Sequence, residues 1–208
     1  MDNCGPLIYI VDDDASVSRA LALLLRSHGF KVETFTRAED FSASKHPKVP
    51  SCLILDIKLP DIDGLALQDA MAVGKLAIPI IFITGYGDIP MSVKAIKAGA
   101  IDFLPKPVTK KKLLNAIAQA ISKNKTQIKE QAEIDKIKRR CRTLSPRELE
   151  VFQLVAKGML SKQIARKRGT SLQTIKVHRG RVMQKMQAKT VTELIRFAQK
   201  AGITSPSV

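Results

Sequence analysis

The chain has 208 residues, which is enough for one large domain or two small ones. Hydrophobic residues make up 45% of it and charged residues 26%, and this balance excludes a globally disordered protein. No apolar run approaches the roughly 18 residues of a membrane span, and the first residues lack the pattern of a secretory signal, so we expect a cytoplasmic protein with no membrane partner. Three distant cysteines, Cys4, Cys52 and Cys141, predict reduced thiols rather than a disulfide framework or a zinc site.

The net charge of +16 is concentrated in the second half of the chain. Residues 1–124 carry 15 Lys and Arg against 13 Asp and Glu, whereas residues 125–208 carry 20 against 6. A basic half of this kind indicates a nucleic acid or an anionic membrane as its partner. The membrane alternative is weak because the basic half lacks the hydrophobic wedge of a membrane-surface helix.

Short apolar strands alternate with helical patterns in the first half. Several strand candidates are continuously apolar, which is typical of parallel strands covered by helices on both faces. We therefore expect an α/β domain over residues 1–124 with a doubly wound, five-stranded parallel sheet. The expected strands are 7–11, 31–35, 52–56, 79–84 and 101–104, and the expected helices are 15–27, 38–43, 65–73, 89–98 and 110–122.

The second half divides into a polar stretch and a helical region. Residues 125–139 contain no Gly or Pro and predict a linker, helical over part of its length or else a disordered tether. Residues 140–208 predict a small all-α unit of four helices. Ser145-Pro146-Arg147-Glu148 and Thr190-Val191-Thr192-Glu193 have the pattern of capping boxes at the first and fourth of these helices, and Ser161 and Ser171 are expected to cap the second and third.

Polar side chains follow four strands of the predicted sheet. Asp12 and Asp13 come after the first strand, Asp56 ends the third, Thr84 ends the fourth and Lys106 follows the fifth. The carboxyl ends of parallel strands meet at one edge, so we expect these groups to converge. Clustered carboxylates attract Mg²⁺, a carboxylate can accept a phosphoryl group, and a hydroxyl and an ammonium can hold its oxygens. This pattern predicts a Mg²⁺-dependent phosphoryl site with Asp56 as the nucleophile.

Taken singly, these residues have ordinary explanations. An Asp after a strand often only caps the next helix, as we expect of Asp14. The joint placement of all five groups favours a site. An enzyme of another class, a phosphohydrolase with an aspartate nucleophile, usually has a second acid two positions after that nucleophile, and here that position is Lys58. We therefore expect no enzyme.

Four motifs of the first half form a specific combination: Val11-Asp12-Asp13-Asp14, Leu55-Asp56-Ile57-Lys58-Leu59-Pro60 with Asp63-Gly64, Thr84-Gly85, and Phe103-Leu104-Pro105-Lys106-Pro107. Together they resemble a two-component receiver domain over about the first 120 residues, and residues 84–107 resemble the FixJ branch in particular. The resemblance implies a flavodoxin-like fold and phosphorylation of the central aspartate by a sensor histidine kinase.

The same resemblance implies roles for individual residues. Asp12, Asp13, Asp56 and the main-chain carbonyl of Lys58 would hold Mg²⁺. Thr84 and Lys106 would contact the phosphoryl group, and Phe103 would swing inward as the aromatic switch residue. The bond between Lys106 and Pro107 would be cis. Tyr is common at the position of Phe103, and because Phe lacks the hydroxyl, a hydrogen-bonded outward state is lost.

The basic half carries a helix-turn-helix pattern, with its turn at Gly169-Thr170. The core side of the following helix would hold Ile175, Val182 and Met186. Its opposite side carries Thr174, Lys176, Val177 and Arg181. Lys and Arg bind phosphates or guanine edges, and Val contacts thymine methyl groups. An amphipathic helix with a solvated basic face is the alternative.

Further motifs favour the DNA-binding interpretation: Leu144-Ser145-Pro146-Arg147-Glu148, Lys162-Gln163-Ile164-Ala165, Thr174-Ile175-Lys176-Val177-His178-Arg179 and Val182-Met183-Gln184-Lys185-Met186. They resemble the LuxR-type DNA-binding domain over about residues 140–204. The resemblance implies double-stranded DNA as a partner and dimerisation through the fourth helix. The implied DNA contacts are Thr174, Lys176, Val177, His178, Arg181 and Lys185, and the dimerisation candidates are Leu194, Ile195 and Phe197.

The whole chain therefore resembles a response regulator of the FixJ/NarL type. Such a protein is a transcription regulator in which phosphorylation, here of Asp56, promotes homodimerisation and DNA binding. One alternative stays open, a DNA-binding protein that works without a kinase and uses its receiver only for dimerisation.

Overall fold

The computed structural model describes residues 5–85 and 89–203, so Cys4 and residues 86–88 of the FixJ-like segment lie outside the described residues. Two compact units divide the chain, Met1–Lys129 and Glu130–Val208. Among the described residues, no helix combines the length and the apolar character that crossing a bilayer requires.

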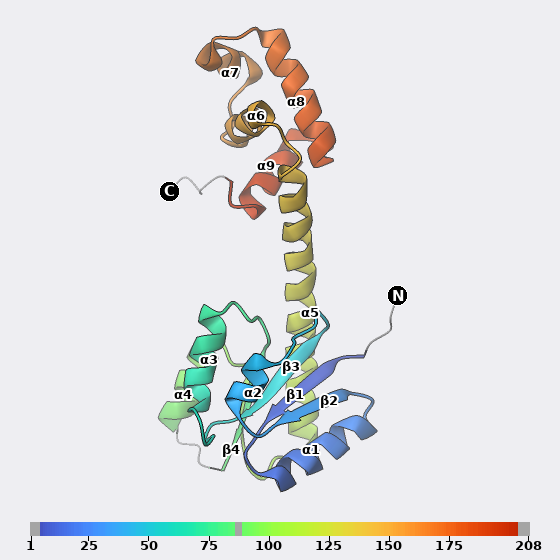
Figure 1. Ribbon diagram of the computed structural model, residues 1–208, viewed down its shortest axis with the longest axis vertical. Coiled ribbons are helices and arrows are strands. Elements are labelled where there is room, and N and C mark those ends of the chain that lie inside the picture. The colour runs from blue at the N-terminus through green and yellow to red at the C-terminus, as the bar shows by residue number, and fades with distance from the viewer. Residues whose placement is uncertain (1–4, 86–88, 204–208) are drawn as a thin grey trace. The chain divides into compact units, whose positions relative to one another are not determined.

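The first unit is a parallel sheet with helices on both faces (Figure 1). Its strand order, β2-β1-β3-β4-β5, confirms the expected doubly wound topology. The strands are β1 (Leu7–Val11), β2 (Lys31–Phe35), β3 (Ser51–Asp56), β4 (Ile80–Thr84) and β5 (Asp102–Pro105). The helices are α1 (Ala15–Ser27), α2 (Ala38–Ala43), α3 (Gly64–Val73), α4 (Ile89–Lys97) and α5 (Lys110–Cys141).

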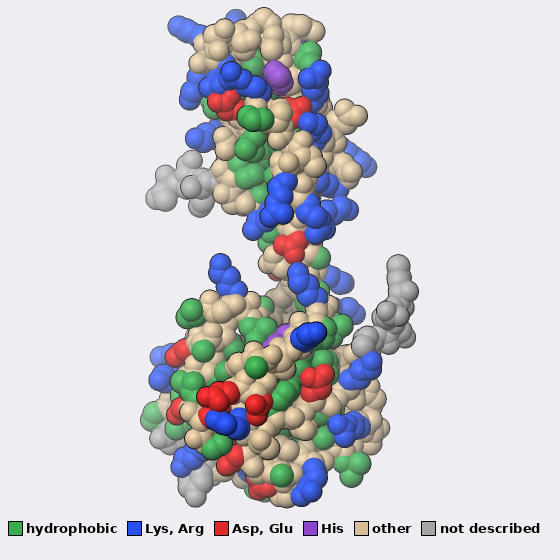
Figure 2. All heavy atoms as spheres, in the orientation of Figure 1, with side chains coloured by type: hydrophobic (Ala, Val, Ile, Leu, Met, Phe, Trp, Pro, Cys, Tyr) green, Lys and Arg blue, Asp and Glu red, His purple; other side chains and the backbone are tan. Residues whose placement is uncertain are grey.

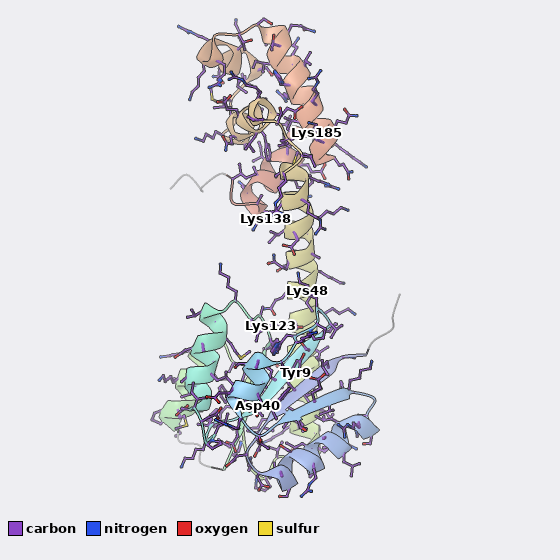
Figure 3. The ribbon with its side chains drawn as sticks, viewed as in Figure 1. Tyr9, Asp40, Lys48, Lys123, Lys138 and Lys185 are labelled. Atoms are coloured by element: carbon purple, nitrogen blue, oxygen red, sulfur yellow. The ribbon has the colours of Figure 1, made fainter. Side chains whose placement is uncertain are left out.

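Alternate residues of the central strands fill two separate cores. Leu53 and Leu55 of β3 pack in the core that α2, α3 and α4 cover, whereas Cys52 and Ile54 pack in the core that α1 and α5 cover. Tyr9 on β1, labelled in Figure 3, is fully buried in the first core, with its ring centroid 5.4 Å from that of Phe41. Burial on both faces explains the continuously apolar runs of these strands.

The last helix of the first unit is much longer than expected. The sequence predicts an end at residue 122, but α5 continues to Cys141, so residues 125–139 are helical throughout. The stretch lacks Gly and Pro, and no residue in it interrupts the helix. The division between the compact units falls inside this helix, between Lys129 and Glu130.

The second unit contains the four short helices that the sequence predicts, and the end of α5 packs with them. These are α6 (Pro146–Ala156), α7 (Ser161–Arg168), α8 (Leu172–Met186) and α9 (Val191–Lys200). Their shared core contains Phe152, Ile164, Val182 and Leu194, and Ile137 of α5 is buried with them.

Three of the four expected helix caps are present. Ser145 and Glu148 form the predicted capping box, and Ser171 and Thr190 cap α8 and α9. The capping box predicted at Thr190 is incomplete, because the Glu193 side chain accepts a hydrogen bond from the Lys189 N–H instead of the Thr190 N–H. Ser161 was expected to cap α7, and this is wrong. Leu160 takes the N-cap position instead, and the Gln163 side chain accepts a hydrogen bond from its N–H.

Candidate functional sites

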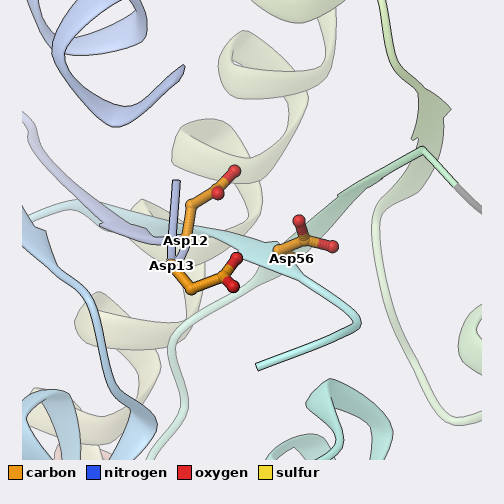
Figure 4. Close-up of side chains that lie close together, drawn as sticks. All are labelled: Asp12, Asp13 and Asp56. Carbon is orange, nitrogen blue, oxygen red and sulfur yellow. The ribbon is translucent and has the colours of Figure 1, made fainter. Parts of the chain in front are cut away.

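The acidic side chains predicted to converge do so at the carboxyl edge of the sheet. Asp12 and Asp13 follow β1 and Asp56 ends β3, and one carboxylate oxygen of each lies within 4.8 Å of the others (Figure 4). Asp12 and Asp56 are buried, at 2% and 8% exposure, whereas Asp13 is exposed. The neighbouring Asp14 does not join them, because its carboxylate caps α1 by accepting hydrogen bonds from the N–H groups of Ser16 and Val17, as predicted.

Lys106 connects two of the carboxylates. Its ammonium donates to Asp12 Oδ2 at 2.7 Å and to Asp56 Oδ2 at 2.6 Å. Burial raises the pKa of Asp12, and this effect exceeds the lowering by the hydrogen bond from Lys106. Burial disfavours the charged form of Lys106, but its hydrogen bonds to Asp12 and Asp56 outweigh burial and raise its pKa. The lysine is therefore held as a cation beside the Asp56 carboxylate.

The donor set of this site fits a divalent metal ion. Three carboxylates with one ammonium leave two negative charges without a compensating group in the cluster. Mg²⁺ would balance them, because it prefers carboxylate oxygens and retains waters or phosphate oxygens as its other ligands. The exposed Asp13 leaves this side of the cluster open to solvent.

The loop after Asp56 is fixed by backbone contacts. The Lys58 N–H donates to Asp56 Oδ1 at 3.3 Å, and Gly64 N–H donates to the Ile57 carbonyl at 2.7 Å. A Cβ atom on Gly64 would lie 2.6 Å from the Asp56 carbonyl oxygen, so only glycine fits there. This contact explains the glycine of the Asp63-Gly64 motif, and the Asp63 carboxylate caps α3 by accepting a hydrogen bond from the Leu65 N–H.

Asp61 of the same loop was missed by sequence reasoning. Its Oδ2 accepts a hydrogen bond of 3.0 Å from the Glu39 N–H at the start of α2, a helix whose N-cap residue, Arg37, provides no side-chain cap. A carboxylate capping a helix across 22 residues leaves no local sequence signal.

The remaining predicted groups lie on β4 and β5. Thr84 is 1% exposed at the end of β4, and its carbonyl accepts a hydrogen bond from the Lys106 N–H at 2.8 Å. Phe103 is half-buried, with its ring centroid 6.3 Å from that of Phe82. The Lys106–Pro107 bond is cis, as the resemblance implied.

In the second unit, α8 carries the predicted DNA-contacting residues. Figure 2 shows Lys and Arg side chains over much of the visible surface of this unit, with few acidic ones. Thr174, Lys176, Val177 and Arg181 of α8 are all exposed. His178 is half-buried. Ser171 caps α8, so the exposed Thr174, Lys176 and Val177 lie in its first two turns, where recognition helices contact base edges.

Lys185 differs from the other predicted DNA contacts. Its ammonium donates to Glu148 Oε2 at 2.6 Å and to the Thr143 carbonyl at 3.1 Å. The Glu148 side chain is 4% exposed, and the pair ties α8 to the start of α6. Hydrogen bonding by Lys185, followed by that of the Ser145 N–H, holds the pKa of Glu148 at about 2. Lys185, although exposed, is therefore engaged in an ion pair within the second unit.

Two of the three dimerisation candidates are not available at the surface. Leu194 and Phe197 are 0% and 5% exposed and belong to the core of the second unit. Both lie in a core that α5 enlarges by adding Ile137. Ile195 is half-buried.

Fold and site together define an α/β domain with an acidic cluster at its sheet edge, joined to a helix-turn-helix domain. The family model described as "Response regulator receiver domain" matches residues 8–118, and that described as "Bacterial regulatory proteins, luxR family" matches residues 142–198. Both matches agree with the two resemblances found in the sequence.

Relatives cover nearly the whole chain. Nodulation protein W of Bradyrhizobium diazoefficiens is 43% identical over 96% of this chain and 88% of its own. The transcriptional regulatory protein FixJ of the same species is 39% identical over 94% and 96%. The solved structure of the response regulator StyR has 41% identity and a TM-score of 0.79, and the match covers 94% of this chain and 99% of its own. The structure of full-length FixJ from B. japonicum has 37% identity and a TM-score of 0.54, and the match covers 96% of this chain and 98% of its own. The chain belongs to the FixJ-type response regulators, two-component transcription regulators with a receiver domain and a LuxR-type DNA-binding domain.

Proposed function

We propose that Asp56 accepts a phosphoryl group from a sensor histidine kinase and that this modification increases homodimerisation and DNA binding. The observation that carries the proposal is the contact of the Asp56 carboxylate with Lys106 inside the acidic cluster. A carboxylate oxygen of Asp56 would attack phosphorus as the bond from phosphorus to the histidine nitrogen breaks. The imidazole would leave, and an acyl phosphate would form.

The chain's own groups would each have a part in this transfer. Mg²⁺, held by Asp12, Asp13, Asp56 and the Lys58 carbonyl, would neutralise charge on the phosphoryl oxygens. Lys106, already beside Asp56, would form a charge-assisted hydrogen bond with one of these oxygens. The Thr84 hydroxyl would take another, and Phe103 would follow Thr84 inward. A shift of this kind requires contacts that differ between the two states, and Thr84 and Phe103 would supply them.

The second unit would bind double-stranded DNA through the exposed side of α8. Lys176 and Arg181 would contact phosphates or guanine edges, Val177 a thymine methyl group, and Thr174 and His178 would add polar contacts. Ile195 remains the dimerisation candidate on α9. Because DNA and the catalytic parts of histidine kinases are cytoplasmic, we place the protein in the cytoplasm.

Selection from a random DNA library tests the proposal. The full chain would be incubated with the library and Mg²⁺, with and without beryllium fluoride as a phosphoryl mimic. We expect one enriched motif with two half-sites, recovered more strongly with the mimic. Failure to enrich any sequence would reject specific DNA binding, and enrichment that the mimic does not change would favour the regulator that works without a kinase.

A further inference from the structure

The end of α5 is held against the end of α8 by directional contacts. Arg140 donates to the Met186 carbonyl at 3.1 Å and also to Gln187 Oε1. In the other direction, Lys185 of α8 donates to the Thr143 carbonyl just beyond α5 (Lys185 is labelled in Figure 3). The two helix ends therefore exchange hydrogen bonds through side chains of both partners.

Arg140 suits the groups that it meets. The last carbonyls of a helix have no partner within the helix and carry partial negative charge, so a guanidinium there is favourable. Gln187 has φ of 53°, in the left-handed region that a residue other than glycine rarely adopts. The guanidinium holds both the last helical carbonyl and the side chain of this residue. One planar group with donors in fixed directions thus fixes the end of α8.

Apolar and ionic contacts extend this attachment along α5. Ile137 is 1% exposed in the core of the second unit, and Cys141 Sγ lies 3.9 Å from Met186 Sδ. One turn before Ile137, Glu133 forms an ion pair of 2.6 Å with Lys200 of α9. Residues 133–141 therefore pack as a further helix of the second unit, although the LuxR-type family model begins only at residue 142.

We propose that residues 133–141 are a functional part of the DNA-binding domain and that Arg140 is a positioning residue, which fixes the orientation of α8. This inference rests on the proposed function, since it assumes that α8 reads DNA. Apolar packing of Ile175, Val182 and Met186 is not directional and permits small rotations of α8 about its axis. The guanidinium restricts that rotation at one end, together with the contacts of Lys185 with Glu148 and Thr143. Because α8 is a single helix about 22 Å long, a rotation at its end moves Lys176 and Val177 relative to base edges.

The test compares two neighbouring arginines in the full chain. Arg140→Ala removes the contacts with α8, whereas Arg139→Ala removes the same charge from an exposed side chain one residue away. Affinity is measured for a duplex obtained by selection and for a random duplex, over a range of salt concentrations. Hydrogen exchange of the amides of residues 183–188 reports on the end of α8.

We expect Arg140→Ala to reduce the ratio of the affinity for the selected duplex to that for the random duplex about tenfold. Hydrogen exchange of the amides at the end of α8 should become faster. The salt dependence of DNA binding should equal that of Arg139→Ala. Arg140→Lys should restore part of the ratio, because it keeps a positively charged donor group. Equal ratios for the two alanine variants would overturn the inference. An equal loss on both duplexes with a weaker salt dependence would also overturn it, since Arg140 would then be a phosphate contact. If wild-type protein itself shows no specific binding, the proposed function fails instead.

Discussion

The Lys106 ammonium lies 2.6 Å from Asp56 Oδ2, although 50 residues separate the two in the chain and β4 stands between their strands. The parallel sheet produces this contact by bringing the ends of β3 and β5 to one edge. The same ammonium also meets Asp12 at the end of β1, so one cation connects both sides of the acidic cluster. A phosphoryl group on Asp56 would meet a positive charge that the fold already holds in place.

Asp56→Asn should abolish the incorporation of acid-stable, base-labile phosphate from a small phosphodonor with Mg²⁺. An amide of the same shape cannot form the acyl phosphate. Labelling is measured by phosphate transfer from a radioactive donor. The control is Asp69→Asn, an exposed carboxylate on α3, which should label like wild type. Undiminished labelling of the Asp56 variant would contradict the assignment of the nucleophile.

Asp13→Ala should weaken Mg²⁺ binding, because a carboxylate of the cluster is lost while Lys106 keeps its contacts with Asp12 and Asp56. Isothermal titration of the unphosphorylated protein measures the affinity without any activity. Asp40→Ala on α2, which removes an exposed carboxylate outside the cluster, should leave the affinity unchanged. Equal affinity of the two variants would remove Asp13 from the ligand set.

Thr84→Ala should leave phosphorylation of Asp56 largely intact and reduce the gain in DNA affinity that follows it. The hydroxyl is expected to contact the phosphoryl group only after transfer, so its loss affects the response more than the chemistry. DNA affinity is measured with and without beryllium fluoride. Thr34→Ala, an exposed position on β2, is the matched control. A wild-type response of the Thr84 variant would show that this threonine does not relay the signal.

Glu148→Gln should destabilise the second unit at neutral pH and lose this effect in acid. The pKa of Glu148 is about 2 in the folded protein and near 4.5 in the unfolded one, so the charged carboxylate stabilises the fold above pH 4.5. That contribution declines as pH falls from about 4.5 to about 2. Glutamine can still serve in the capping box, so the substitution isolates the charge. Calorimetric unfolding temperatures of variant and wild type should converge over this interval, and a constant difference would contradict the ion pair with Lys185.

Lys176→Ala should weaken specific DNA binding by about 1–3 kcal/mol if the lysine reads a base edge, whereas a phosphate contact would give a similar loss on every sequence. Arg181→Ala should behave in one of the same two ways. Val177→Ala should change sequence discrimination but not the salt dependence, because valine has no charge. Affinities for selected and random duplexes at several salt concentrations distinguish these results. Lys123→Ala, an exposed residue of α5 in the first unit, is the control. Wild-type binding by a variant without both Lys176 and Arg181 would reject α8 as the recognition helix.

The sequence predicts the sheet and its acidic edge well, because both depend on local patterns. A buried parallel strand requires a continuous apolar run, and the residue that ends it must lie at the common edge, so Asp12, Asp56 and Lys106 follow from strand assignment alone. The ion pair of Lys185 with Glu148 joins residues 37 positions apart and has no local signal. The burial of Leu194 and Phe197 depends on the size of a core that includes α5, and the pattern of α9 by itself cannot reveal that size.

The alternation of β3 between its two cores also limits how this chain can change in length. Asp56 follows Cys52 and Ile54 at steps of two residues, and Ile57 follows Leu53 and Leu55 in the same way. Deleting or inserting a single residue within β3 would turn every side chain after that point to the opposite face of the sheet. A hydrophobic residue would then stand where the Asp56 carboxylate meets Lys106. Apolar substitutions of similar volume change neither the face on which each side chain lies nor the contact of Asp56 with Lys106. The strand can therefore vary in composition during evolution while its residue count stays fixed.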